Sequence, residues 1–332
     1  MTDDAASNPR RRLIRIAKLT FRLIIFSLVC FGIWHTVQKA VVDLRDRQFG
    51  ITQIQPGWLV LAGALYLAGL VPCWAFWQRT LHAMGQRPRW IESFRAYYIG
   101  SLGKYVPGKA LVVVMRTGFI RSERCDTTVA AVSVFVETLT MMAVGAFVAA
   151  AVLATLYAHH VWLVGLAIGL MLCAGVPTAP PIFRRLVRLV GVKKVNPNID
   201  AALAGLDFRL MLYGWVTVGL GWLLLGLSLW ATLRAIPTTT TAPVAFSDLP
   251  LVTACVALAM VAGFLSLLPG GIGIREYVVM TLIALPFGEG AAAISAILLR
   301  LVWLLAELVL AGGLYLAKPR NSQLNSMDKD AG

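Results

Sequence analysis

Long apolar runs separated by short, mostly basic polar segments dominate the chain. A transmembrane helix needs about 20 mostly apolar residues, and six uninterrupted runs come close to or exceed that length. They cover residues 20–42, 58–77, 127–156, 161–178, 210–233 and 291–317. The pattern therefore predicts an all-α polytopic membrane protein with about six transmembrane helices.

Two further apolar stretches, 91–120 and 250–285, are each interrupted by a Pro-Gly segment. The first break contains YVPGK at 105–109, and the second contains LPGGIG at 268–273. Breaks of this kind at membrane depth are tolerated where the backbone is buried in protein or lines a wet cavity. Each stretch holds two pieces of helical length, so we expect two re-entrant helical hairpins.

Composition excludes a water-soluble globule. Only 14% of the 332 residues are charged and 58% are hydrophobic, whereas soluble domains carry about 25% charged residues. We expect a basic tail over 1–19, an integral membrane domain over 20–317 and a polar tail over 318–332. The connecting loops are too short for a soluble catalytic domain. The five scattered cysteines form no ligand motif, so we expect no cofactor and no metal, and no nucleic-acid partner.

The distribution of Lys and Arg predicts the orientation. If the N-terminus is cytoplasmic and both hairpins return to their starting side, cytoplasmic segments hold 21 basic residues and external loops hold four. If 91–120 crossed fully instead, the basic run at 184–194 would be external. The charge split therefore favours hairpins, an inner (plasma) membrane location and cytoplasmic N- and C-termini.

This topology also predicts an inverted repeat. The halves 58–156 and 210–317 each consist of a span, a hairpin and a span, with opposite direction. Pro107 and Pro269 of the two hairpins lie 162 residues apart. Secondary transporters with inverted repeats bind their substrates at the repeat interface, among broken helices.

Eight charged residues fall within predicted membrane segments, where a lone charge costs about 2.5–3.5 kcal/mol and should face a partner or water. They are Lys104, Lys109, Arg116, Glu137, Arg275, Glu276, Arg300 and Glu307. One interpretation is a substrate site. The alternative is structural, with the basic residues of the first hairpin reaching the cytoplasmic surface and Arg300 pairing with Glu137.

The hairpin turns add backbone chemistry to these charges. Residues 103–109 fit G-x-x-x-x-G-K, but a nucleotide-binding loop is not expected, because Ala110 follows the lysine and no buried strand precedes it. Free backbone N–H groups at such a turn still suit a phosphate, and an arginine can bind phosphate through two parallel hydrogen bonds. The turn residues of the predicted substrate site are Pro107, Gly108, Pro269, Gly270, Gly271 and Gly273.

The segments GSLGKYVPGK at 100–109, followed by Arg116, and LLPGGIGIRE at 267–276 resemble the two signature segments of the lysylphosphatidylglycerol synthase transmembrane-region family. In bifunctional members this region moves aminoacylated phospholipid across the bilayer, and a separate soluble domain performs the synthesis. The resemblance therefore implies a lipid translocase. Because the sequence ends at Gly332, we expect a stand-alone member without the synthase domain.

We accordingly expect a flippase-like protein, not an enzyme, that moves an anionic or aminoacylated phospholipid or a polyprenyl-phosphate lipid. Lys104, Lys109, Arg116 and Arg275 would hold phosphate, and the three carboxylates would act as counter-charges or hold an amino headgroup. Two alternatives stay open: a membrane-embedded, glycosyltransferase-like enzyme acting on a lipid-linked substrate, and a non-catalytic partner in cell-envelope assembly. The sequence also leaves open whether the chain forms a homo-oligomer.

Overall fold

The fold is helical throughout the part of the chain that the structure describes. The computed structural model describes residues 34, 38, 54–105, 110–156, 161–236, 244–266, 271 and 273–317. Within these ranges the regular structure consists of helices, apart from one isolated bridge between Ser122 and Cys125. The predicted all-α class is therefore confirmed.

Among the described residues, five helical stretches are long and apolar enough to cross a membrane. They are α2 (Pro56–Ala83), α5 (Thr127–Leu156), α9 (Phe208–Arg234), α10 with its preceding turn (Phe246–Leu265) and α12 (Glu289–Leu316). A helix of 27 residues such as α9 extends about 40 Å, which exceeds a hydrocarbon core of about 30 Å. The chain is therefore a multi-pass membrane protein.

Most of the predicted spans coincide with these helices. The matching predictions are 58–77, 127–156, 210–233 and 291–317. In the predicted span 161–178 the structure has the 15-residue helix α6 (Val161–Gly175) and the short turn η3 (Val176–Thr178). The predicted span 20–42 lies outside the described residues, apart from Trp34 and Gln38.

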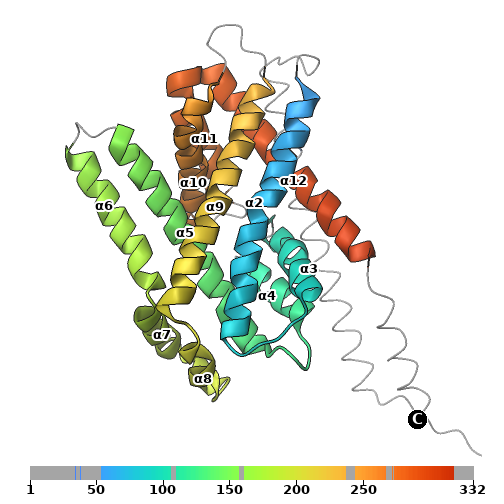
Figure 1. Cartoon of the computed structure of the whole chain (residues 1–332). Coiled ribbons are helices and arrows are strands. Elements are labelled where there is room, and N and C mark those ends of the chain that lie inside the picture. Colours follow the sequence, from blue (N-terminus) through green and yellow to red (C-terminus); the bar gives the residue numbers. More distant parts are fainter. Residues whose placement is uncertain are drawn as a thin grey trace, which may run out of the picture.

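Both interrupted stretches fold as pairs of shorter helices. The elements are α3 (Trp90–Ser101), η2 (Leu102–Tyr105) and α4 (Ala110–Ile120), then α10 (Leu249–Leu265) and α11 (Ile274–Phe287). In Figure 1, α4 returns to the end of the bundle where α2 finishes, whereas α11 returns to the opposite end, where α9 finishes. Because α10 with its preceding turn, η5 (Phe246–Asp248), would by length suffice to cross a bilayer, re-entrance of 250–285 stays a prediction, as does the inverted repeat.

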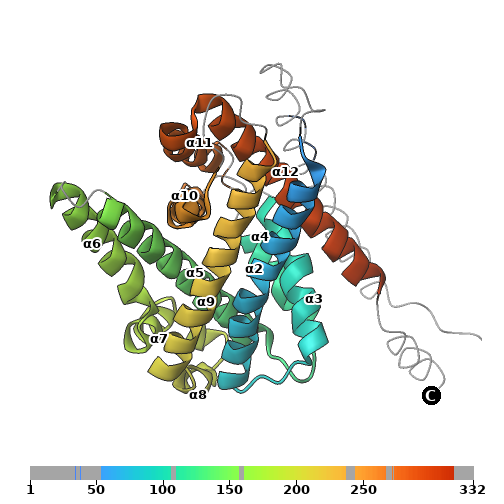
Figure 2. The same ribbon diagram turned by 45° about the horizontal axis from the view of Figure 1, so that its top comes forward.

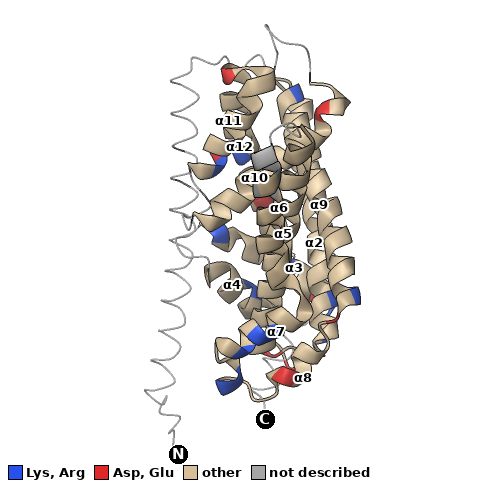
Figure 3. Ribbon diagram, turned by 90° about the vertical axis from the view of Figure 1, so that its left-hand side faces the viewer, with Lys and Arg blue, Asp and Glu red and all other residues tan. Residues whose placement is uncertain are grey.

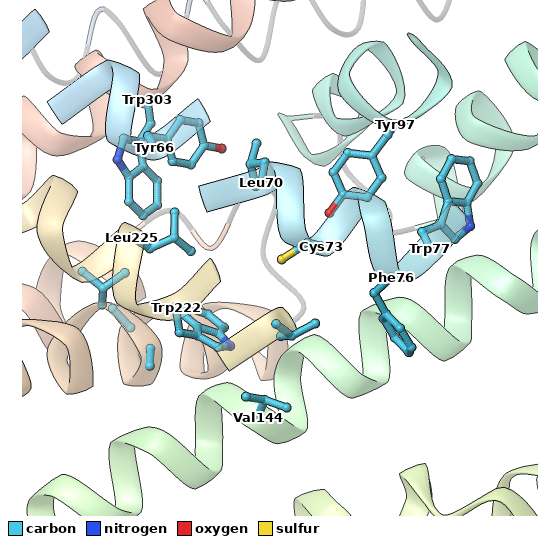
Figure 4. Packing of buried hydrophobic residues seen from close by; sticks show 14 of the residues in the cluster. Tyr66, Leu70, Cys73, Phe76, Trp77, Tyr97, Val144, Trp222, Leu225 and Trp303 are labelled. Atoms are coloured by element: carbon cyan, nitrogen blue, oxygen red, sulfur yellow. The ribbon is translucent and has the colours of Figure 1, made fainter. Parts of the chain in front are cut away.

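The centre of the bundle is the crossing of α2 and α9, which pack on each other closely (Figure 2). A Cβ atom on Gly221 would lie 2.9 Å from the carbonyl oxygen of Gly69, so only glycines allow this approach. Next to the crossing, the indole of Trp222 donates to the carbonyl of Met141 at 3.0 Å and fixes α9 against α5. Figure 4 shows this layer continuing through Cys73 and Leu225.

Basic residues gather at one end of the molecule (Figure 3). The elements there are α7 (Pro180–Leu189), η4 (Val192–Lys194) and α8 (Ile199–Ala204). Asp200 pairs with Arg188 and Lys193, at 2.9 Å each. Hydrogen bonds from Lys193 and Arg188 lower the pKa of Asp200. This end is the one that the charge distribution predicts to be cytoplasmic.

Candidate functional site

The charged residues of the membrane segments form two separate groups. The first, here called the Glu137 cluster, comprises Tyr97, Ser101, Arg116 and Glu137 on α3, α4 and α5. The second surrounds a cavity between η2, α10, α11 and α12 and is called the cationic pocket. Its charged residues are Lys104, Arg275, Glu276 and Arg300, which line the cavity, and Glu307, which pairs with Lys104.

The Glu137 cluster is buried, and its polar groups bond to one another, apart from Nε of Arg116, which has no hydrogen-bond partner among the described residues. Arg116 and Glu137 are only 5% and 1% exposed. Nη1 of Arg116 lies 2.7 Å from Oε2 of Glu137, and the hydroxyl of Tyr97 donates to Oε1 at 2.9 Å. Nη2 of Arg116 donates to Ser101 at 3.3 Å. Both oxygens of the carboxylate and two arms of the guanidinium are thus occupied within the protein.

Packing closes the remaining faces of Arg116. Its guanidinium lies 3.9 Å from the ring centroid of Tyr97 and 5.5 Å from that of Trp77, a cation–π arrangement. A Cβ atom on Gly100 would come 2.5 Å from Cγ of Arg116, so α3 and α4 touch here through a glycine. The geometry is that of a structural ion pair that fastens the first hairpin to α5.

In the second group, Glu307 on α12 receives donors from the first half of the chain. Lys104 and the hydroxyl of Tyr66 both contact Oε1 of Glu307, and the hydroxyl of Tyr105 donates to Oε2 at 2.9 Å. Lys104 also donates to the Tyr66 oxygen at 3.0 Å. Trp303, one turn before Glu307, stacks on the Tyr66 ring with the centroids 4.4 Å apart. These contacts hold η2 of the first hairpin against α12 of the second half.

Arg275 occupies a slot made by two glycines. A Cβ atom on Gly263 would lie 2.7 Å from its Cγ, and one on Gly271 would lie 2.8 Å from its Nε. Gly271 also has a φ of +67°, which residues with side chains rarely adopt. The second turn therefore needs glycine both for its backbone conformation and for the passage of this side chain.

The neighbouring charges are paired, but Arg275 is not. Glu276 forms an ion pair with Arg300 on α12, and its Oε2 accepts the backbone N–H of Gly273 at 2.7 Å, which caps the start of α11. Within the described ranges, Arg275 forms no ion pair, and its buried Nε finds no hydrogen-bond partner. An unpaired buried donor of this kind carries a penalty of about 1–3 kcal/mol.

A cavity of about 50 Å³ lies among these groups. Lys104, Tyr105, Arg275 and Arg300 reach it from the polar side. Apolar residues complete the wall: Val256, Ala259, Met260, Val279, Ala296, Leu299 and Trp303. A space of this size admits water but not a lipid headgroup, so the pocket must widen to bind one.

The described charges of the cationic pocket do not balance. Three cations (Lys104, Arg275 and Arg300) stand against two carboxylates (Glu276 and Glu307). The surplus cation is Arg275, which lines the cavity and whose Nε, in the slot between the two glycines, has no described partner. The pocket is thus suited chemically to an oxyanion that can accept two parallel hydrogen bonds from a guanidinium.

The structure separates the predicted site residues into distinct groups. Lys104, Arg275, Glu276, Arg300 and Glu307 come together, with Gly271 and Gly273 beside them, whereas Arg116 and Glu137 form the other cluster. The turn residues Pro107, Gly108, Lys109, Pro269 and Gly270 lie outside the described residues.

The alternative interpretation of the membrane charges, as structural groups only, predicted two contacts that the structure does not show. Arg300 pairs with Glu276, not with Glu137, because Glu276 lies on α11, which packs directly against α12, whereas Glu137 is held by Arg116. Arg116 does not reach the surface, since its guanidinium is held by Glu137 in the interior.

Sequence reasoning missed the tyrosines. Tyr66, Tyr97 and Tyr105 supply hydroxyls to the two buried carboxylates. The available signal was that a tyrosine inside an apolar segment needs a partner for its hydroxyl group. The tryptophan partners follow only from the fold.

Comparison with known families agrees with this architecture. The sequence profile of the family described as Lysylphosphatidylglycerol synthase TM region matches residues 16–311 of the 332. The matched range includes both clusters and both hairpins. A search of curated proteins finds no match.

Proposed function

The chain belongs to the lysylphosphatidylglycerol synthase transmembrane-region family, and we propose that it moves a phosphate-bearing lipid across the membrane by holding the phosphate in the cationic pocket. The family places the chain among membrane proteins with a lipid-related role. The observation that carries the finer proposal is the unpaired Arg275 at a cavity whose cations outnumber its carboxylates.

A phosphate would relieve the imbalance of the pocket. A buried charge without a partner destabilises a membrane protein, and a phosphate oxygen would accept the hydrogen bond that Nε of Arg275 lacks. Arginine binds phosphate through two parallel N–H groups, which a lysine cannot reproduce. Arg300 and Lys104 would add charge attraction while keeping their carboxylate partners.

The position of the pocket supports transport rather than simple binding. Its wall combines η2 of the first hairpin with α10 and α11 of the second, and the two hairpins return to opposite ends of the bundle (Figure 1). Movement of one hairpin would open the pocket toward one side, and movement of the other would open it toward the opposite side. This is the logic of alternating access at a repeat interface.

The transferase alternative gains less support from the geometry. It requires a carboxylate free to act as an acid or base in a water-filled cleft. Glu276 and Glu307 are each engaged by a protein cation, and the cavity holds only about 50 Å³. We further propose the inner membrane as the site of action, with both termini cytoplasmic, from the distribution of basic residues.

Reconstitution tests the proposal. Liposomes containing a phospholipid with a fluorescent NBD group on one acyl chain would be treated with dithionite, which bleaches only the outer leaflet. Wild-type protein should expose the inner-leaflet label with time. Arg275→Gln should slow this exposure at least about tenfold, because one charge-assisted interaction of about 1.5–3 kcal/mol is lost, and Arg275→Lys should restore only part of the rate.

The matched control is Arg188→Gln, which removes an exposed arginine of α7 that pairs with Asp200 of α8. It should leave the exposure rate unchanged. Equal rates in wild-type protein, Arg275→Gln and protein-free liposomes would refute the proposal.

A further inference from the structure

We infer that the lipid handled by this pocket bears a phosphate without a compensating ammonium group, so that an anionic lipid is preferred over an aminoacylated one. The inference rests on the proposed function and specifies its substrate class. It follows from how the charged groups of the pocket are already engaged, and not from the size of the cavity.

Recognition of an ammonium group by charge pairing would require a free carboxylate. Both carboxylates of the pocket are taken: Glu307 accepts from Lys104, Tyr66 and Tyr105, and Glu276 accepts from Arg300. Its second oxygen also caps the backbone of Gly273 at 2.7 Å. A lipid ammonium would have to displace a tethered protein cation from either site.

Recognition of a phosphate requires no displacement. Nε of Arg275 is buried without a described partner, and the described residues of the pocket include one cation more than carboxylates. A singly charged phosphodiester would therefore bring the pocket to neutrality. A headgroup with a net positive charge would add to an existing surplus, and like charges that meet in a desolvated site disfavour binding strongly.

The Glu137 cluster offers no second ammonium site. Its single carboxylate is held by Arg116 at 2.7 Å and Tyr97 at 2.9 Å, and Glu137 is 1% exposed. Among the residues that the structure describes, no other carboxylate lies in the interior of the helical bundle. The selectivity thus follows from the charge arrangement of the described membrane interior.

The experiment compares three lipids that share the same glycerophosphate and NBD-labelled acyl chain: phosphatidylglycerol, phosphatidylethanolamine and lysylphosphatidylglycerol. Their headgroups are anionic, zwitterionic and cationic. In wild-type proteoliposomes we expect phosphatidylglycerol to cross at least about tenfold faster than lysylphosphatidylglycerol, with phosphatidylethanolamine between them. Lysylphosphatidylglycerol crossing as fast as phosphatidylglycerol, or faster, would overturn the inference while leaving lipid transport intact.

A binding measurement separates this inference from the proposed function. In detergent, phosphatidylglycerol should raise the melting temperature of the wild-type protein more than lysylphosphatidylglycerol does. If no lipid crosses but this difference remains, transport is refuted and the selectivity stands; equal shifts would overturn the selectivity. Unlabelled phosphatidylglycerol and polyprenyl phosphate, added as competitors, distinguish the two sources of an anionic phosphate. Stronger competition by lysylphosphatidylglycerol than by either of them would contradict a preference for an anionic lipid.

A charge variant sharpens the result. Arg300→Gln removes one cation from the pocket and releases Glu276, so the transfer rate of lysylphosphatidylglycerol relative to phosphatidylglycerol should rise at least about tenfold. Arg188→Gln is the control and should leave this ratio unchanged. A ratio in folded Arg300→Gln protein equal to that of the wild type would contradict the role assigned to the paired carboxylates.

Discussion

The Glu137 cluster and the cationic pocket are built from the same residue types but differ in the balance between cations and carboxylates. Each contains arginine, glutamate and tyrosine on a hairpin and a long helix. In the first, one buried cation meets one buried carboxylate. In the second, three cations meet two carboxylates beside an open space. A buried charge in a membrane is therefore a weak indicator of a binding site unless it is also unpaired and beside a cavity.

In each half of the chain an ion pair joins the hairpin to the long helix that follows it, and the sign of the charge on the hairpin differs between the halves. The first hairpin contributes Arg116 to Glu137 of the following long helix, whereas the second contributes Glu276 to Arg300. Both pairs fasten α4 or α11 to the helix that follows. The second hairpin carries Arg275 in addition, and this residue accounts for the difference between the two regions.

The largest effect is expected from breaking the balanced cluster. Glu137→Gln leaves Arg116 buried without a counter-charge and should destabilise the folded protein by about 3–5 kcal/mol. Adding Arg116→Gln should recover much of this loss, because two neutral amides need no charge compensation. Thermal unfolding in detergent measures both. A double variant as unstable as the single one would show that the cluster is not held by charge pairing.

A smaller effect on stability, but a clear one on transport, should follow from Gly271→Ala. The new methyl group would meet Nε of Arg275 at 2.8 Å and disturb the slot that presents it. Gly288→Ala is the matched control, since Gly288 also has a positive φ, +83°, but its Cβ position is open. Each variant strains the backbone by about 1–3 kcal/mol, and Gly288, with a ψ of 157°, lies in a region that almost only glycine adopts.

Lipid transfer should therefore fall several-fold more in Gly271→Ala than in Gly288→Ala, measured by the dithionite assay on equal amounts of folded protein. Equal losses in the two variants would mean that only the backbone strain matters. The second turn would then be a connector and not part of the site.

Removing one tyrosine hydroxyl compares the two carboxylates directly. Tyr97→Phe takes the donor from Oε1 of Glu137, whose one charge partner among the described residues is Arg116. Tyr105→Phe takes one of three donors from Glu307, which keeps Lys104 and Tyr66. We expect losses of about 2 and about 1 kcal/mol of unfolding free energy. The reverse order in thermal unfolding would show that Glu307 depends on Tyr105 more than its geometry indicates.

Hydropathy alone was sufficient to predict the long helices and the two interrupted stretches, because burial in lipid demands long apolar runs. It could not predict which buried charges pair. That choice depends on the rotation of each helix and on its neighbours, so Glu137 meets Arg116 from its own half while Glu307 meets Lys104 from the other. The slot for Arg275 likewise requires Gly263, which lies twelve residues away on another helix.

The smallest effect is expected outside the membrane, at Asp200. Its pairs with Arg188 and Lys193 lie on an exposed surface, where such pairs contribute little. These hydrogen bonds lower the pKa of Asp200, so any stabilisation is present at neutral pH and is lost as the pH falls below about 4, toward the lowered pKa. Asp200→Asn should leave both the melting temperature at neutral pH and the lipid transfer rate unchanged. A substantial fall in the melting temperature would mean that the basic end is held together by this carboxylate, and that balance of charge matters at the surface as it does in the interior.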